Sequence, residues 1–360
     1  MSVIALRGLT KRFGSVVAVD DLSLEIADGE LLALLGPSGC GKTTTLRSVA
    51  GFEMPDAGQI YFGDRHVTDL LPEQRNIGMV FQNYALFPHM TVQDNVAFGL
   101  EMRKTAAGAA AQRVAAVLAK VQLTGLEGRY PRQLSGGQQQ RAALARALVI
   151  APDVLLLDEP LANLDAKLRE EMRFYVRSLQ QDSGITAIYV THDQAEAMVI
   201  ADRIAVMFGG HLHQLAPPDE VYNHPATAMV AEFIGLTNFI EGKVAAAEGG
   251  FITLETALGP LRCRGEATAG PATRLLAVRP EALQLSAEAR GEADLNRLRG
   301  VVRARAFLGN LMDYRVEIAP DVLLRVQGDP HAPFAVGDGV HVVFAPAATW
   351  SVPSPEGPPR

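Results

Sequence analysis

The stretch GPSGCGKTT, residues 36–44, has the residue types and spacing of a phosphate-binding loop. Its glycines let the backbone curl so that several N–H groups can face a β-phosphate, and a helix that starts here adds the positive end of its dipole. Lys42 would supply a positive charge to the β- and γ-phosphates, and the hydroxyl of Thr43 would coordinate Mg²⁺. The pattern therefore predicts a site for a nucleoside triphosphate and its metal ion. The residues expected to contact the nucleotide are Gly36, Pro37, Ser38, Gly39, Cys40, Gly41, Lys42, Thr43 and Thr44.

Two carboxylates, Asp158 and Glu159, directly follow the apolar run VLLL. An aspartate in this place can hold Mg²⁺ through its water shell, and a neighbouring glutamate can orient or deprotonate an attacking water. In isolation, two carboxylates that cap a strand would be the better explanation. Beside a phosphate loop, the catalytic interpretation is favoured.

Two further candidates are His192 in VTHD and Gln82 in VFQN. A lone histidine is more often a packed or solvent-exposed residue than a catalytic one. His192, however, ends a third apolar run and is followed by Asp193, which favours a place in the site. Gln82 offers a neutral amide that could contact both the metal ion and the water, although alone it would carry almost no weight.

Three buried strands must position these residues. The stretches ELLALLG (30–36), DVLLLDEP (153–160) and TAIYVTHD (186–193) are apolar runs that end in glycine or polar residues. The first 235 residues alternate such runs with helical segments, which predicts an α/β domain with a mostly parallel sheet. Ligands of open α/β sheets bind at the carboxyl ends of strands, so the three strand ends should converge on one site.

Composition limits the classes of function. The 360 residues are enough for two or three domains, and the net charge of -7 argues against a nucleic-acid partner. With two cysteines, Cys40 and Cys263, no disulfide framework is expected, and a reducing compartment is the default. Cys40 is interpreted as a small residue tolerated in the turn. The N-terminal residues do not resemble a signal peptide, and no apolar run approaches the ~20 residues of a membrane helix. A membrane role would require a partner.

The motifs occur in the order GPSGCGKTT, VFQN, LSGGQQQR, VLLLDEP, LANLD and THD. Together they resemble the nucleotide-binding subunits of ATP-binding cassette (ABC) transporters over about residues 3–236. LSGGQQQR, residues 134–141, fits the signature that separates this family from other phosphate-loop proteins. The resemblance implies a P-loop ATPase that converts ATP and water to ADP and phosphate with Mg²⁺. The helical spacing of apolar residues after Tyr84 predicts an inserted helical subdomain at about 84–145.

In this family the signature faces the phosphate loop of a second subunit, which implies that ATP lies between two copies of the chain. Ser135 can donate a hydroxyl hydrogen bond, and the glycines after it expose backbone N–H groups at a helix N-terminus. A monomer should then bind ATP but hydrolyse it poorly. The residues that would act in trans are Ser135, Gly136, Gly137, Gln138 and Asp165.

The same resemblance assigns roles to the other positions. Phe13 would stack on adenine where many relatives have tyrosine. Ala162 stands where relatives commonly have serine, so one hydroxyl contact across the dimer would be missing. The catalytic set would be Lys42, Gln82, Glu159 and His192. The metal set would be Thr43, Gln82 and Asp158.

The C-terminal part carries short strand-like runs between glycines and prolines. They predict an ATPase domain at 1–236, an all-β domain of small barrels at 237–350 and a disordered tail at 351–360. No internal repeat is evident, although two similar barrels could be hidden there. The segments 275–283 and 306–318 resemble the oligonucleotide-binding-fold-like regulatory domain of bacterial importer ATPases. Arg279 is interpreted as a structural residue more readily than as part of a sensor site.

These resemblances imply the ATPase of a binding-protein-dependent importer. It would lie at the cytoplasmic face of the inner membrane as a homodimer with two integral permease subunits, which in turn receive an extracytoplasmic solute-binding protein. Polyamine and ferric-iron members are slightly more similar than sugar members, so a polyamine is the expected solute, with ferric iron, sugar or glycerol-phosphate, and sulfate as the alternatives. The alternatives are a non-transport ATPase of the same superfamily and a C-terminal domain that senses a ligand or a regulatory protein. A single ATPase domain and the acidic charge argue against the first of these.

Overall fold

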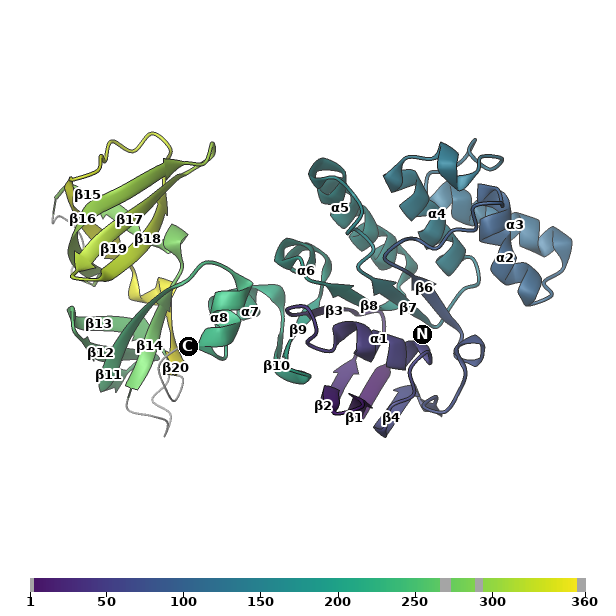
Figure 1. Cartoon of the computed structure of the whole chain (residues 1–360), viewed down its shortest axis with the longest axis horizontal. Helices are drawn as coiled ribbons and strands as arrows, with labels where there is room; N and C mark the ends of the chain where they lie inside the picture. Colours follow the sequence, from purple (N-terminus) through teal and green to yellow (C-terminus); the bar gives the residue numbers. More distant parts are fainter. Residues whose placement is uncertain (1–2, 266–272, 289–293, 355–360) are drawn as a thin grey trace. The chain divides into compact units, whose positions relative to one another are not determined.

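The computed structural model describes residues 3–265, 273–288 and 294–354 (Figure 1). The chain forms two compact units, Met1–Pro218 and Asp219–Arg360. Each unit has its own hydrophobic core.

The boundary between the units lies earlier than the sequence suggests, at 218 instead of 236. Helices α7 (Pro218–Asn223) and α8 (Ala228–Ile234) therefore fall almost wholly in the second unit. The physical reason is the buried guanidinium of Arg279, which donates hydrogen bonds to the backbone oxygens of Tyr222 and Ala231 at 2.8 and 2.9 Å. These contacts give Arg279 a structural role.

A six-stranded sheet forms the centre of the first unit, in the order β10-β9-β3-β8-β7-β6. All neighbouring strands are parallel except β9 and β10. The strands are β3 (Leu31–Leu35), β6 (Ile77–Val80), β7 (Val154–Asp158), β8 (Thr186–Thr191), β9 (Arg203–Phe208) and β10 (His211–Ala216). Since β3, β8 and β7 are adjacent and parallel, the three predicted strand ends lie side by side at one edge of the sheet, as expected.

A second, antiparallel sheet has the order β2-β1-β4-β5. Its strands are β1 (Ile4–Phe13), β2 (Val16–Ile26), β4 (Ala57–Phe62) and β5 (Arg65–His66). Helix α1 (Lys42–Ala50) shares one apolar core with this sheet and with one face of the parallel sheet. Leu32 and Leu34 of β3 reach this core together because alternate side chains of a strand point to the same face. Leu46 of α1 completes the contact and fixes the helix that opens at the phosphate loop.

Helices α2, α3 and α4 are grouped together beside β6 and β7 (Figure 1). They lie between those strands in the chain, where the sequence predicts an inserted helical subdomain. The helices of the first unit besides α1 are α2 (Val92–Met102), α3 (Ala107–Lys120), α4 (Gly136–Leu148), α5 (Ala166–Ser183) and α6 (Gln194–Ile200), with 3-10 turns at Pro72–Gln74 and Pro131–Gln133. Among the described residues, no helix has the length and apolarity needed to cross a membrane.

The second unit is all-β after its two helices. Strands β11, β12, β13, β20 and β14 form a closed barrel, and β15, β19, β16, β17 and β18 form a five-stranded sheet in that order. The sequence predicts small barrels in this part of the chain. The described residues form one closed barrel and one five-stranded sheet. The strands are β11 (Asn238–Glu248), β12 (Phe251–Thr256), β13 (Gly259–Arg264), β14 (Thr273–Val278), β15 (Gln284–Ser286), β16 (Asn296–Phe307), β17 (Met312–Ala319), β18 (Val322–Gly328), β19 (Gly339–Phe344) and β20 (Thr349–Pro353), with 3-10 turns at Pro280–Ala282 and Pro346–Ala348.

The strand order shows a repeat in which the last strands are exchanged. Strands β11–β15 and β16–β20 each run as four strands, a 3-10 turn and a final strand, but β15 pairs with β19 and β20 pairs with β14. Asn238 and Asn296 open the two halves and bind across them: each side chain accepts from the N–H and donates to the carbonyl of one residue, Arg325 and Arg262 respectively. The two halves therefore hold each other closed.

The expected disordered tail at 351–360 is wrong for its first residues. Ser351, Val352 and Pro353 belong to β20 and pair with β14 inside the barrel. The composition of this segment, rich in proline and serine, predicts disorder, but tertiary pairing overrides that local signal. Residues 355–360 lie outside the described part of the chain.

A buried arginine supports α1 from its C-terminal end. Arg75 is fully buried, and burial lowers its pKa to about 10. Its guanidinium donates to the carbonyls of Ser48 and Val49 in the last turn of α1, at 2.7 and 2.9 Å, and to those of Thr68 and Leu70. The positive charge thus supplies donors to carbonyls at a helix end, of which that of Ser48 also accepts from the N–H of Gly51.

Replacing Arg75 by methionine should destabilise the first unit by about 3 kcal/mol, because buried carbonyls would lose their donors. The urea midpoint of the full chain, followed by far-UV circular dichroism, measures the loss. Arg65→Met is the matched control, since Arg65 is exposed and donates to one carbonyl, that of Gln74. Equal shifts for the two variants would contradict the role of Arg75.

Candidate ATP site

The phosphate loop joins the end of β3 to the start of α1. Gly41 has φ of 102° and precedes the first helical residue, and a Cβ atom on it would lie 2.4 Å from the backbone oxygen of Ala18. Gly39 also has positive φ, at 81°. These backbone angles are accessible to glycine and costly for other residues, so the glycines permit the tight curl predicted for phosphate binding.

The ammonium group of Lys42 lies inside the curve of the loop. The residue is 5% exposed, and Nζ donates to the backbone oxygens of Gly36 and Pro37 at 2.8 and 2.9 Å. Its third close contact is the Sγ atom of Cys40 at 3.6 Å, and Cys40 is itself buried. The loop therefore holds a positive charge at the site where the sequence predicts the phosphates of the nucleotide.

The proposed metal ligands Thr43 and Asp158 face each other. The Thr43 hydroxyl lies 3.5 Å from Oδ1 of Asp158, and Asp158 is 9% exposed. The pKa of Asp158 is raised above its ordinary value, mainly by burial. The positive charges of Arg47 and Lys42 offset only part of this rise. A buried carboxylate with one long hydrogen bond is a group that a cation would stabilise. Thr43 and Asp158 offer two oxygen atoms, and Mg²⁺ is commonly bound by one or two such protein ligands together with water and phosphate oxygens.

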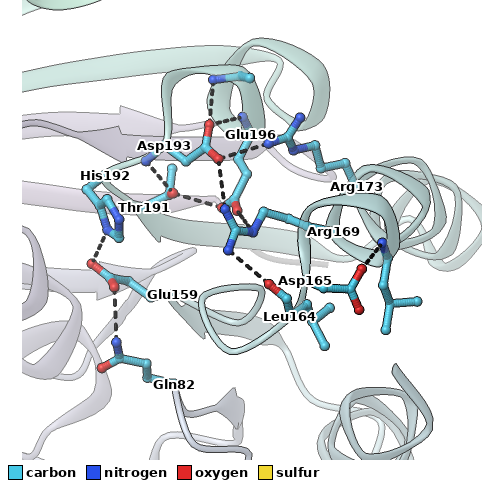
Figure 2. Close-up of polar contacts among 12 residues, drawn as sticks. Gln82, Glu159, Leu164, Asp165, Arg169, Arg173, Thr191, His192, Asp193 and Glu196 are labelled. Atoms are coloured by element: carbon cyan, nitrogen blue, oxygen red, sulfur yellow. Dashed lines mark hydrogen bonds and ion pairs between the residues drawn. The ribbon is translucent and has the colours of Figure 1, made fainter. Parts of the chain in front are cut away.

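Glu159 brings the other catalytic candidates together (Figure 2). Its Oε2 accepts a hydrogen bond from the amide of Gln82 at 3.2 Å, and its Oε1 lies 3.1 Å from Nδ1 of His192. Its φ of 43° is unusual for a residue with a side chain, and its N–H donates to the oxygen of Val190 in β8. The strain turns the carboxylate out of the strand and toward the groups that follow β6 and β8.

The loop after Gln82 is tied to the helical subdomain. Tyr84 and Ala85 both have positive φ, and the guanidinium of Arg146 in α4 donates to both of their backbone oxygens, at 2.8 and 2.6 Å. Asn163 donates to the backbone oxygen of Gln82 at 2.7 Å. A displacement of α4 would therefore be transmitted to the Gln82 backbone.

The signature segment forms a capped helix start. The Ser135 hydroxyl accepts from the N–H of Gln138, and the Gln138 side chain accepts from the N–H of Ser135, which is a capping box. A Cβ on Gly137 would lie 3.2 Å from Leu168, so the glycine allows α4 to lie close to α5. The sequence predicts only nucleotide contacts for these residues, so the helix cap and the close packing of Gly137 are additional roles. In the described residues no hydrogen bond joins this segment to the phosphate loop of its own chain.

The remaining predicted residues lie at exposed positions. Phe13 ends β1 with 47% of its surface exposed, and Lys11 lies over its ring at 5.2 Å. Asp165 is exposed and caps α5, accepting from the N–H of Leu168 at 3.0 Å. Both remain predictions as nucleotide contacts.

Sequence reasoning missed a second polar network beside Glu159. Arg169 and Arg173 of α5 face Asp193 and Glu196 at the start of α6 (Figure 2). A signal existed in the sequence, because Arg169, Arg173 and Arg177 recur every fourth residue and so share one face of a helix.

Two families match parts of the chain. Residues 19–162 match the ABC transporter family, and residues 276–351 match the TOBE domain. The spermidine/putrescine import ATP-binding protein PotA of Chromobacterium violaceum is 44% identical over 96% of this chain and 97% of its own. The Fe(3+) ions import ATP-binding protein FbpC 1 of Rhizobium meliloti is 46% identical over 95% of both chains.

The chain belongs to the ABC transporter family. A solved dimeric structure of an ATP-binding cassette in a post-hydrolysis state, bound to ADP and Pi, is similar as well. It has a TM-score of 0.53 and 31% identity, and it covers 60% of this chain and 98% of that one. This ABC protein is an ATPase coupled to transport, built from an ATP-binding unit and a C-terminal TOBE unit.

Proposed function

We propose that this ABC ATPase powers the import of a polyamine through a membrane permease. The observation that carries the catalytic assignment is the meeting of Glu159 with Gln82 and His192 beside Asp158 and Thr43. The polyamine assignment is supported by the names of relatives from Chromobacterium violaceum, Acidothermus cellulolyticus and Rubrobacter xylanophilus, all spermidine/putrescine import ATP-binding proteins.

Two copies of the chain would form two composite sites. In each, Lys42 and the loop N–H groups bind the phosphates, while Ser135 and the N–H groups of Gly136 and Gly137 approach the γ-phosphate from the other copy. Phe13 would stack on the adenine. The dimeric state of the solved ATP-binding cassette supports this arrangement.

Thr43, Asp158 and Gln82 are the residues that would hold Mg²⁺, which would neutralise charge on the phosphates. Glu159 orients the attacking water and accepts its proton, and His192 holds the Glu159 carboxylate and approaches the γ-phosphate. Gln82 links this carboxylate to the loop that Arg146 ties to α4, so closure and hydrolysis are mechanically joined.

The partners would be two integral permease subunits, reached through the loop at residues 82–89, and an extracytoplasmic solute-binding protein behind them. The chain would act at the cytoplasmic face of the inner membrane. No nucleic acid is proposed as a partner, given the net charge of -7.

Uptake by a deletion strain tests the solute. Deletion should abolish uptake of labelled spermidine or putrescine, and the wild-type gene should restore it, whereas the Glu159→Gln gene should not. Ferric-iron uptake is the matched comparison, because a ferric-iron relative is equally similar. Loss of ferric-iron uptake with normal polyamine uptake would replace the polyamine assignment by the ferric one.

A further inference from the structure

The loop that carries Asp165 is held by a side chain from the first turn of α5. Nη2 of Arg169 donates to the backbone oxygen of Leu164 at 2.9 Å (Figure 2). Leu164 itself is buried, whereas Asp165 is exposed. The guanidinium therefore controls the backbone directly before Asp165.

The other side of this guanidinium faces two fixed carboxylates. Asp193 caps α6 and accepts from Arg173 at 2.8 Å. Glu196 is 3% exposed, and its Oε2 accepts from the hydroxyls of Tyr189 and Thr191 at 2.9 and 2.8 Å. These carboxylates belong to the segment that begins with His192, and they form a rigid anchor.

The contact between Arg169 and this anchor is incomplete. Nη1 lies 3.8 Å from Asp193 and Nε lies 4.0 Å from Oε1 of Glu196. Nε is buried and, in the described part of the chain, has no hydrogen-bond partner. A movement of about 1 Å would bring it to the length of a charge-assisted hydrogen bond.

A small cavity gives room for that movement. It has a volume of about 40 Å³ and is lined by Ala162, Arg169, Glu196 and the catalytic candidates Glu159 and His192. Ala162 has no polar group to fill this space. The loop and the guanidinium can therefore shift toward α6 without displacing a packed side chain.

We propose that Arg169 is a positioning residue: on closure of the dimer it completes the hydrogen bond to Glu196 and so holds the Leu164–Asp165 loop where Asp165 meets the partner subunit. The proposal rests on the composite dimer described under the proposed function. Arg173 differs, because its contact with Asp193 is already made and does not reach the loop.

ATP occlusion in a Glu159→Gln background tests this role. The full-length chain is incubated with labelled ATP and Mg²⁺, and the release of retained ATP is timed after addition of excess unlabelled ATP. Arg169→Met should shorten the half-time of release about 10-fold, the effect of losing one hydrogen bond between charged groups. The initial affinity for ATP should stay within about twofold, because Arg169 does not contact the phosphate loop.

Arg177→Met in the same background is the matched control. Arg177 lies on the same helix and pairs with Asp202, away from the Asp165 loop. It should leave the half-time unchanged, while Glu196→Leu, which removes the acceptor, should shorten it as Arg169→Met does. The double variant Arg169→Met with Glu196→Leu should be no faster than either single variant, because both remove the same contact.

The measurements distinguish a failure of the composite dimer from a failure of the role of Arg169. If Glu159→Gln alone retains no ATP, the composite dimer is wrong. If it retains ATP and Arg169→Met retains it equally long, or if Arg177→Met shortens the half-time as much, the positioning role is overturned. Should Arg169→Met fail to fold, Arg169→Lys carries the same test, because lysine keeps the charge but cannot contact Leu164 and Glu196 together.

Discussion

Replacing Glu159 by glutamine should lower kcat for ATP hydrolysis by about 10²–10⁴-fold and leave ATP binding intact. Glutamine keeps the shape of the side chain and can still contact Gln82 and His192, but it cannot accept a proton from water. Phosphate release by the purified chain gives kcat, and equilibrium dialysis with labelled ATP gives the affinity. The variant should accumulate as a closed, ATP-loaded dimer.

Asp153→Asn is a suitable control for the loss of one carboxylate, because Asp153 precedes the same strand at its other end. It should change kcat by less than about twofold. A Glu159→Gln protein that hydrolyses ATP at the wild-type rate would remove Glu159 from its assigned role.

Mixing two inactive variants should restore hydrolysis. Lys42→Ala removes the charge from one phosphate loop, and Ser135→Asp places a negative charge at the signature helix while keeping an N-cap acceptor. In a mixed dimer, the phosphate loop of the Ser135→Asp copy meets the intact signature of the Lys42→Ala copy. One complete site remains, so the mixture should exceed the summed activity of the two separate proteins.

Thr227→Asp tests whether a charged N-cap alone causes inactivity, since Thr227 caps α8 by the same kind of contact. This variant should retain activity. No gain on mixing, with dimers of both proteins present together, would show that the signature does not act across the dimer or that one site cannot work alone.

The sequence predicts the fold of the first unit well because its signals are local. VLLL and TAIYV are buried strands as the apolar runs indicate, and Asp158, Glu159 and His192 follow them. The parallel pairing of β3, β7 and β8 then brings these residues together, so the general rule for strand ends is enough.

Other features depend on contacts that no local pattern records. The repeat in the second unit is carried by a few positions, such as Asn238 and Gly242 in one half and Asn296 and Gly300 in the other. The incomplete contact of Arg169 depends on distances between α5 and the start of α6. For Gly137 the sequence suggests a ligand contact, whereas the structure adds a packing reason, the closeness of Leu168. One glycine can serve both the ligand contact and the close packing, and the sequence motif indicates only the ligand contact.

The exchange of β15 and β20 has a consequence for synthesis of the chain on the ribosome. The barrel that begins at residue 238 needs β20, which ends at residue 353. Until that strand leaves the exit tunnel, β14 presents an unpaired edge, and open edges of this kind invite pairing with other chains. The ATP-binding unit can fold before β20 has been synthesised, but the C-terminal barrel cannot close until β20 has left the exit tunnel. While β14 is unpaired, neighbouring nascent copies on one messenger RNA can pair their β20 strands with each other's barrels.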